Sequence, residues 1–134
     1  MDFAAEMTVL SQMLTFIRQE ANQAGMSEAH IHKLELASEE ALVNIISYAY
    51  PKKEGKISIQ CSTSGASRFD VTIRDQGLPF NPNEAAVDTE VDKPMNKRKI
   101  GGLGIFLIRK MVDEVSYRRD GNENVLKMTI IVLD

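Results

Sequence analysis

Two polar residues four positions apart, Glu40 and Asn44, stand inside a predicted helix over residues 27–48. Side chains at this spacing share one face of a helix, and here that face borders the apolar stripe. Asparagine is a poor helix former in a helix interior, so Asn44 calls for a functional reason. Its amide oxygen is a hard ligand that suits Mg²⁺, and a carboxylate one turn away can serve as a general base. The alternative is a pair of solvated side chains.

An acid ends a predicted buried strand at Asp75, in the run DQGLPF. In the functional interpretation, the Asp75 carboxylate accepts a hydrogen bond from a ligand amine, and Gly77 leaves room for that ligand. In the alternative interpretation, the two residues only end the strand in a turn, where Asp and Gly are common.

Three glycines, Gly101, Gly102 and Gly104, open directly into an apolar run that ends at Val112 and predicts a buried helix. The first N–H groups of a helix have no intrahelical partner, and the helix dipole adds positive charge there. Glycine lets a ligand approach these groups, so the segment suits a phosphate. Plain packing of a glycine-rich turn is the alternative.

Hydrophobic periodicity supplies the elements that position these residues. The predicted helices cover 4–24, 27–48 and about 101–112, and the predicted strands cover 56–63, 69–73, 114–118 and 125–133. Gly25 is a good stop for the first helix, and Ser27 can cap the second. This order predicts one α+β domain over residues 1–134, with a mostly antiparallel sheet and helices on one face.

The segment from about residue 76 to residue 100 lacks any apolar period and holds three of the four prolines. A loop of this length in a compact domain is usually a lid, a binding loop or a disordered segment. Part of it, over 83–87, can form a short helix. The basic run Lys97, Arg98 and Lys99 either reaches a phosphate or is simply solvated.

Composition narrows the class of protein. The chain has 134 residues and a formal net charge of −3, which disfavours general binding to nucleic acid or to anionic membranes. Cys61 is the single cysteine, so no disulfide can form within the chain. The N-terminus lacks the pattern of a signal peptide, and no apolar run approaches about 18 residues. We therefore expect a cytoplasmic protein.

Taken together, the three motifs resemble the Bergerat ATP-binding fold of the GHKL ATPase superfamily, which joins DNA gyrase B, heat-shock chaperones, sensor histidine kinases and mismatch-repair ATPases. The fuller similarity is to the small anti-sigma-factor serine kinases of the RsbW and SpoIIAB type. It spans about residues 14–133, and it rests on the runs LELASEEALVNIISYAY, DQGLPFNP and GGLGIFLIRKMVDEVSY. The resemblance implies a two-layer α/β sandwich that binds ATP with Mg²⁺ under a lid over about 76–100.

The resemblance also implies a role for each motif residue. Glu40 matches the general base of the family, and Asn44 matches its Mg²⁺ ligand. Asp75 matches the acid that reads the amino group of adenine, with Gly77 beside it. Gly102 and Gly104 match the glycines under the phosphates, and Gly101 precedes them.

Three features depart from the family pattern. Only residues 1–3 precede the first predicted helix, so the usual first strand is expected to be missing or very short, and a homodimer built on that edge is in doubt. Tyr48 stands where the family often has His, and Gln76 stands where a second acid is common.

Three functions are compatible with this pattern. The first is a kinase that phosphorylates a serine on an anti-anti-sigma partner with a STAS domain, and that sequesters a sigma factor. The second is a nucleotide-gated binding protein of the same fold without kinase activity. Glu40 favours the kinase, because a pure switch needs no base. The third, an adaptor that binds no nucleotide, would leave both the glycines and Asn44 without a role.

Overall fold

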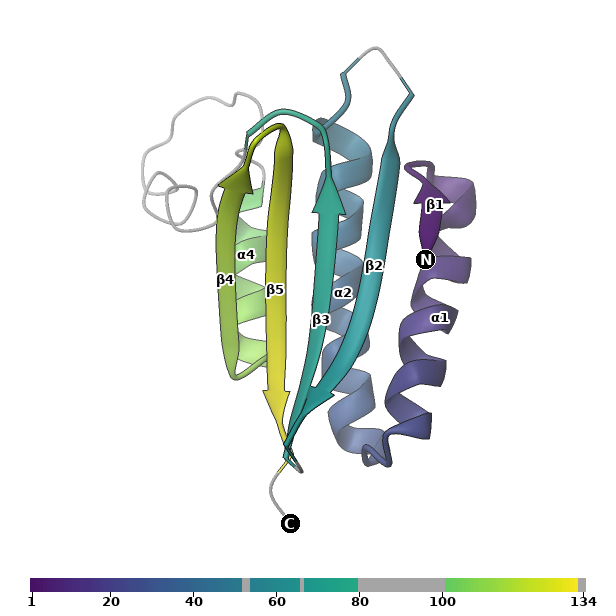
Figure 1. Cartoon of the computed structure of the whole chain (residues 1–134), viewed down its shortest axis with the longest axis vertical. Coiled ribbons are helices and arrows are strands. Elements are labelled where there is room, and N and C mark those ends of the chain that lie inside the picture. The colour runs from purple at the N-terminus through teal and green to yellow at the C-terminus, as the bar shows by residue number, and fades with distance from the viewer. Residues whose placement is uncertain (52–53, 66, 80–100, 133–134) are drawn as a thin grey trace.

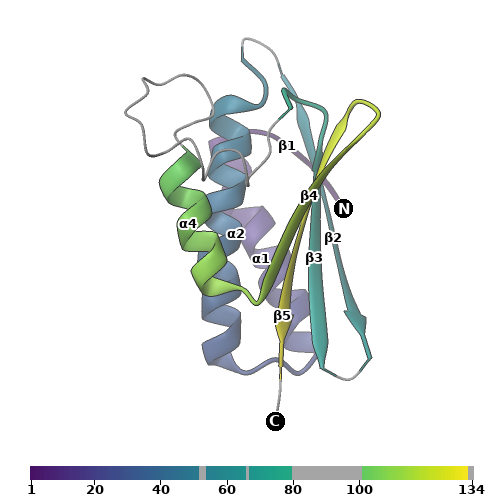
Figure 2. The same cartoon turned by 90° about the vertical axis from the view of Figure 1, so that its left-hand side faces the viewer.

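Helices cover one face of an antiparallel sheet in two layers (Figures 1 and 2). The computed structural model describes residues 1–51, 54–65, 67–79 and 101–132, with side chains from residue 106 onward in the last range. Within these residues, the sheet has five strands in the order β1-β2-β3-β5-β4, and all neighbours are antiparallel. The predicted α+β class with helices on one face is confirmed.

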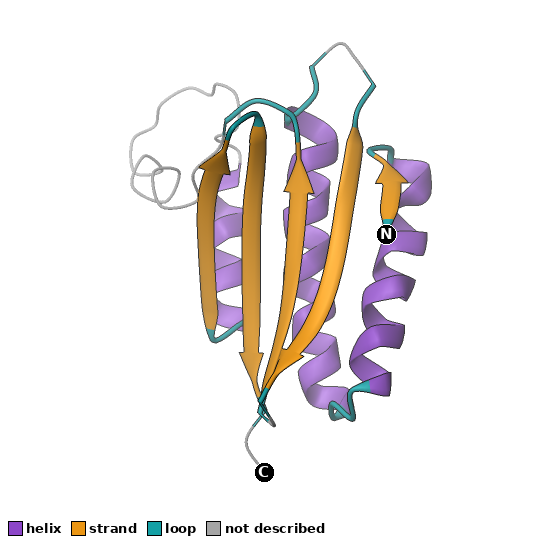
Figure 3. Ribbon diagram, in the orientation of Figure 1, coloured by secondary structure: helices purple, strands orange, loops and turns teal. Residues whose placement is uncertain are grey.

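The described elements follow the predicted order, with one extra strand at the start (Figure 3). The strands are β1 (Asp2–Ala4), β2 (Lys56–Ser64), β3 (Arg68–Asp75), β4 (Glu114–Asp120) and β5 (Glu123–Ile131). The helices are η1 (Met7–Val9), α1 (Leu10–Gln23), α2 (Glu28–Tyr48) and α4 (Gly101–Met111).

Helix α2 forms where the sequence predicts it, because both its cap and its apolar stripe are local signals. The Ser27 hydroxyl accepts a hydrogen bond from the His30 N–H at 3.3 Å and so caps the first turn. Helix α2 lies between α1 and α4 on one face of the sheet (Figure 1), and its stripe belongs to the hydrophobic core. Its predicted residues are all buried: Ile31, Leu34, Ala41, Leu42, Ile45 and Ala49.

The N-terminal prediction is wrong in one respect, since residues 4–9 do not belong to the first helix. Residues 2–4 form β1 instead, and helix α1 begins only at Leu10. Strand β1 pairs with β2, and Met1 continues that pairing because its carbonyl accepts the Ile59 N–H at 2.9 Å. The Phe3 ring also packs on Phe16, with 6.1 Å between ring centroids. The first strand of the family is therefore present but very short.

The core lies between the helices and the sheet, and it is built from alternate residues of the strands. Ile57 and Ile59 on β2 and Val71 and Ile73 on β3 are fully buried. Cys61 follows in the same alternation, half-buried against the core, and burial raises the pKa of its thiol to about 12. This thiol therefore packs as a small hydrophobic group, as the strand pattern predicts.

None of the described helices lies on the opposite face of the sheet (Figure 2). The side chains on that face are mostly polar. Arg68 pairs there with Glu114 at 2.8 Å, and Arg74 lies 3.7 Å from Glu123. None of the described helices is both long enough and apolar enough to cross a membrane.

Candidate functional site

The three predicted motifs lie at one end of the molecule. Helix α2 reaches this end with its last turns, strand β3 ends there at Asp75, and helix α4 begins there (Figures 1 and 2). Gly101, Gly102 and Gly104 form the first turn of α4, as the glycine pattern predicts. Residues 80–100, with the basic run and most of the predicted lid, lie outside the described residues.

Asn44 is the polar residue of α2 that the structure singles out. Its side chain is buried, with 9% of its surface exposed, and neither its amide oxygen nor its amide nitrogen has a hydrogen-bond partner among the described residues. Only the Ser38 hydroxyl shares this state in the described part of the chain. Leaving one such buried group unpaired costs about 1–3 kcal/mol. A ligand at Asn44 would remove that cost.

The oxygen ligands that α2 offers fit Mg²⁺. Glu40 lies one turn before Asn44 and is half-buried, between the exposed Glu39 and the buried Ala41. In nucleotide sites Mg²⁺ takes few protein ligands and completes its shell with phosphate oxygens and water. The buried amide oxygen of Asn44 provides one such protein ligand.

Asp75 is buried, with 4% of its surface exposed, and one oxygen of its carboxylate accepts two hydrogen bonds. Oδ1 accepts the Gly77 N–H at 2.9 Å and the Asn124 side-chain amide at 2.9 Å. Asp75 lies on the same face of β3 as Ile73, so its side chain points to the layer that holds the helices. Two hydrogen bonds to one oxygen fix the orientation of this carboxylate.

Gly77 lies against the residue that follows α2. A Cβ on Gly77 would overlap the carbonyl oxygen and the Cβ of Ala49. The next residue, Leu78, donates its N–H to the same Ala49 carbonyl at 2.8 Å. This close approach alone requires glycine, and it ties the segment after Asp75 to the end of α2. The predicted role of Gly77 in leaving room for a ligand is a separate matter and stays a prediction.

We expect Gly77→Ala to destabilise the ligand-free protein, because the added methyl group meets backbone atoms that cannot easily move. Overpacking of this kind costs about 1–3 kcal/mol, measurable as a lower urea midpoint. Gln76→Ala is the matched control, since the exposed Gln76 side chain can be cut back without touching Ala49. Unchanged stability with weakened nucleotide binding would instead assign Gly77 to the ligand.

Tyr50 joins the same segment to strand β2. Its hydroxyl donates to the Lys56 carbonyl at 2.7 Å and accepts the Gln76 N–H at 2.6 Å, while its ring leaves no room for a side chain at Gly55. Burial raises the pKa of the Tyr50 phenol, although the bond from Gln76 opposes this shift. The phenol is therefore neutral at pH 7 and can both donate and accept.

A cavity of about 1040 Å³ lies beside this junction, and Tyr50, Asp75, Gly77 and Arg119 are among its lining residues. Glu40 and Asn44 do not line it. The structure thus places the predicted site residues at one end of the molecule but does not join all of them in this cavity.

Sequence reasoning missed two residues of this region, Tyr50 and Asn124. Tyr50 is an aromatic residue between a helix end and Pro51, which carries no specific signal. Asn124 is 4% exposed and lies at the start of β5, where the sequence predicts a strand only from residue 125. A polar residue in a turn-like DGNEN run gives no sign that it will be buried beside Asp75.

Comparisons with known proteins agree with the family that the motifs resemble. A sequence profile of the family described as "Histidine kinase-like ATPase domain" matches residues 3–130. The curated relatives include proteins named serine-protein kinase RsbW from Bacillus cereus strain AH187 and Bacillus anthracis strain A0248. Each is 28% identical over 109 residues, which cover 79% of this chain and 68% of the relative.

Solved structures share the fold at low sequence identity. A Mycobacterium tuberculosis structure of RsbU and RsbW domains matches with a TM-score of 0.63 at 12% identity. The match covers 97% of this chain, which spans 32% of that longer chain. The mycobacterial sensor histidine kinase MprB matches with a TM-score of 0.58 at 14% identity, over 98% of this chain and 97% of the other.

Proposed function

Since this chain belongs to the histidine kinase-like ATPase domain family, we propose that it binds ATP with Mg²⁺ and phosphorylates a serine on an anti-anti-sigma (STAS) partner. We propose further that it sequesters a sigma factor and acts in the cytoplasm. The observation that carries the nucleotide site is the buried amide of Asn44, which has no hydrogen-bond partner among the described residues. It lies in the last turns of α2, at the end of the molecule where β3 ends at Asp75 and α4 begins (Figure 1). The similarity to proteins named serine-protein kinase RsbW supports the reaction.

In this proposal, each motif has one task. The Asp75 carboxylate accepts a hydrogen bond from the adenine amino group, and the N–H groups of the first turn of α4 bind phosphate oxygens. Asn44 holds Mg²⁺, which supplies charge neutralisation on the phosphates. Glu40 accepts the proton of the attacking serine. Phosphoryl transfer needs little more from a protein than such positioning and electrostatic stabilisation.

Nucleotide binding is tested by thermal unfolding with and without Mg-ATP. A ligand at about 100 times its dissociation constant stabilises a fold by roughly 2.7 kcal/mol, so we expect a clear rise in Tm. Asn44→Ala should remove most of the Mg²⁺-dependent part of this rise. The same variant should leave the ligand-free protein about as stable as the wild type, because the lost packing is offset by removing an unpaired buried amide.

Asn22→Ala, on the exposed surface of α1, is the matched control and should keep the full shift. The absence of any shift with saturating Mg-ATP or Mg-ADP would overturn the nucleotide site. Incubation with labelled ATP, Mg²⁺ and the candidate STAS protein then tests the kinase reaction directly.

A further inference from the structure

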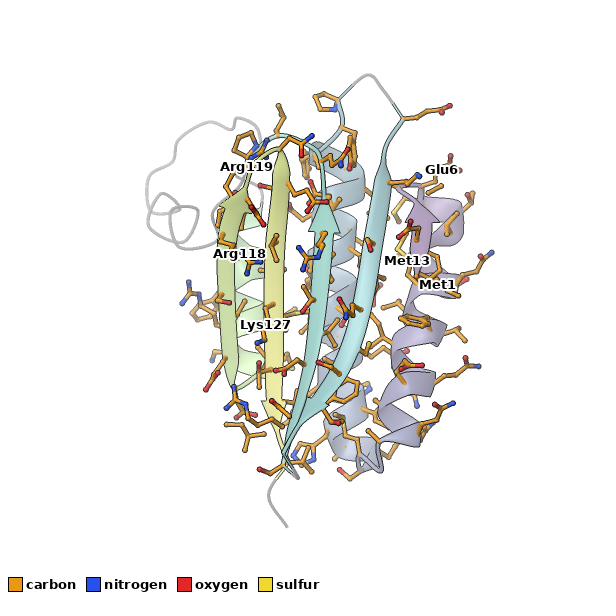
Figure 4. All side chains as sticks on the ribbon, in the orientation of Figure 1. Met1, Glu6, Met13, Arg118, Arg119 and Lys127 are labelled. Carbon is orange, nitrogen blue, oxygen red and sulfur yellow. The ribbon has the colours of Figure 1, made fainter. Side chains whose placement is uncertain are left out.

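Three side chains form a row across the sheet at the end where Asp75 lies. Asp75 on β3 is the register partner of Asn124 on β5, and Asn124 is the register partner of Arg119 on β4. Register partners of an antiparallel pair project from the same face of the sheet. Arg119 lies at the end of β4 (Figure 4), so the row reaches from the buried acid to the edge strand.

The Asn124 amide has one orientation in this row. Its Oδ1 accepts from the Tyr117 hydroxyl at 2.6 Å and from Arg119 Nη1 at 3.2 Å. Its Nδ2 donates to Asp75 Oδ1 at 2.9 Å and to the Leu78 carbonyl at 2.8 Å. A guanidinium can only donate, and a carboxylate or carbonyl can only accept. If the Asn124 amide were flipped, its NH₂ group would face the Arg119 guanidinium, and its oxygen would face the Asp75 carboxylate and the Leu78 carbonyl.

Arg119 also acts on the backbone beside the acid. The Nη1 atom that contacts Asn124 donates to the Gly77 carbonyl at 2.9 Å. The Gly77 N–H donates to Asp75 Oδ1, so both backbone polar groups of Gly77 are hydrogen-bonded, the N–H to Asp75 and the carbonyl to Arg119. The tip of the β4–β5 hairpin thus holds both the Asp75 carboxylate and the segment that follows it.

We propose that Tyr117 and Arg119 are positioning residues for nucleotide recognition: they orient the Asn124 amide, which in turn holds Asp75 as a fixed acceptor. This proposal rests on the proposed function, and it adds the basis of purine specificity. A fixed acceptor favours a purine with a 6-amino group, as in adenine, over one with a 6-oxo group, as in hypoxanthine. If the Asp75 carboxylate can rotate, we expect the preference for the 6-amino purine to fall.

The test compares ADP with IDP, whose bases differ at position 6, amino against oxo, and in the hydrogen that the oxo form carries on N1. Calorimetry should show that the wild type prefers ADP by about 10-fold or more, the factor for losing one hydrogen bond to a charged group. Tyr117→Phe and Arg119→Gln should each lower this ratio by about threefold or more, mainly by weakening ADP. Arg118→Gln is the matched control, because Arg118 is the neighbouring β4 residue and projects from the opposite face.

An equal loss of ADP and IDP affinity in the variants would overturn the proposal, because a general structural defect weakens both nucleotides alike. A second measurement needs no nucleotide. Amide exchange of the Gly77 N–H, followed by NMR in the ligand-free protein, should be about tenfold faster or more in Tyr117→Phe, and unchanged in Arg118→Gln. Tyr117→Phe is the sharper variant here, because its hydroxyl acts on Asn124, one step away from Asp75.

The two measurements separate the two proposals. Unchanged exchange in Tyr117→Phe overturns the positioning role, whatever nucleotides bind. Faster exchange together with a lower ADP preference supports it. A wild type that binds neither nucleotide refutes the proposed function, and it also overturns the part of this inference that concerns purine specificity.

Discussion

Replacing Glu40 by glutamine is expected to lower the rate of serine phosphorylation by about 10²–10⁴-fold, the usual contribution of a general base. Glutamine keeps the size of the side chain and part of its hydrogen bonding, but it cannot accept a proton as a base. Glu40 lies one turn before Asn44, so the base and the proposed Mg²⁺ ligand share one face of α2. Phosphoryl transfer passes through a loose transition state, which places the loss toward the low end of this range.

The experiment measures transfer from labelled ATP to the STAS partner, with Mg-ATP binding and partner binding followed in parallel. Both binding steps should be unchanged in Glu40→Gln, because the proposed role of the carboxylate is only to take the proton. Glu39→Gln is the matched control, since Glu39 is the adjacent acid and is exposed. It should phosphorylate at the wild-type rate.

Two outcomes would change the assignment of Glu40. Phosphorylation at the wild-type rate by Glu40→Gln would remove this residue from the mechanism. No transfer by the wild type to any candidate partner, with partner binding that still depends on ATP, would favour the nucleotide-gated switch over the kinase.

Asp75→Asn is expected to weaken ADP binding by about 5–150-fold, because a buried polar contact left unpaired costs about 1–3 kcal/mol. The variant amide can keep its oxygen toward the donors that contact Asp75 Oδ1, the Gly77 N–H and the Asn124 amide. Its NH₂ group then stands where the carboxylate has its second oxygen. When adenine binds, its amino group would meet the NH₂ group of the variant asparagine, and two hydrogen-bond donors would face each other.

Asp70→Asn provides the control for this prediction. Asp70 is the other buried acid of β3, it lies on the polar face, and it accepts a 2.6 Å hydrogen bond from the Thr129 hydroxyl. Its replacement should change the free energy of unfolding but not the affinity for ADP. If Asp75→Asn binds ADP as tightly as the wild type, Asp75 serves only the turn.

Local patterns in the sequence predicted much of the fold. The apolar stripe and the Ser27 cap give α2 within one residue of its observed bounds, and strict alternation gives the β2–β3 hairpin. These signals are local because helix and strand periods depend on residues a few positions apart. Residue types and spacing pointed to the motif residues of α2, of the β3 end and of the α4 start, and the resemblance gave each an expected role.

Only the tertiary structure decided how these motifs are supported. Strand β1 is three residues long and exists because β2 offers it backbone partners, so no pattern in residues 2–4 could predict it. The glycine at position 77 is required by Ala49, which is distant in the chain, and the burial of Asn124 follows from its register with Asp75. Residue types and their spacing thus gave the candidate side chains for chemistry. Long-range pairing of strands determined which neighbours hold them, because register is a property of two segments and not of one.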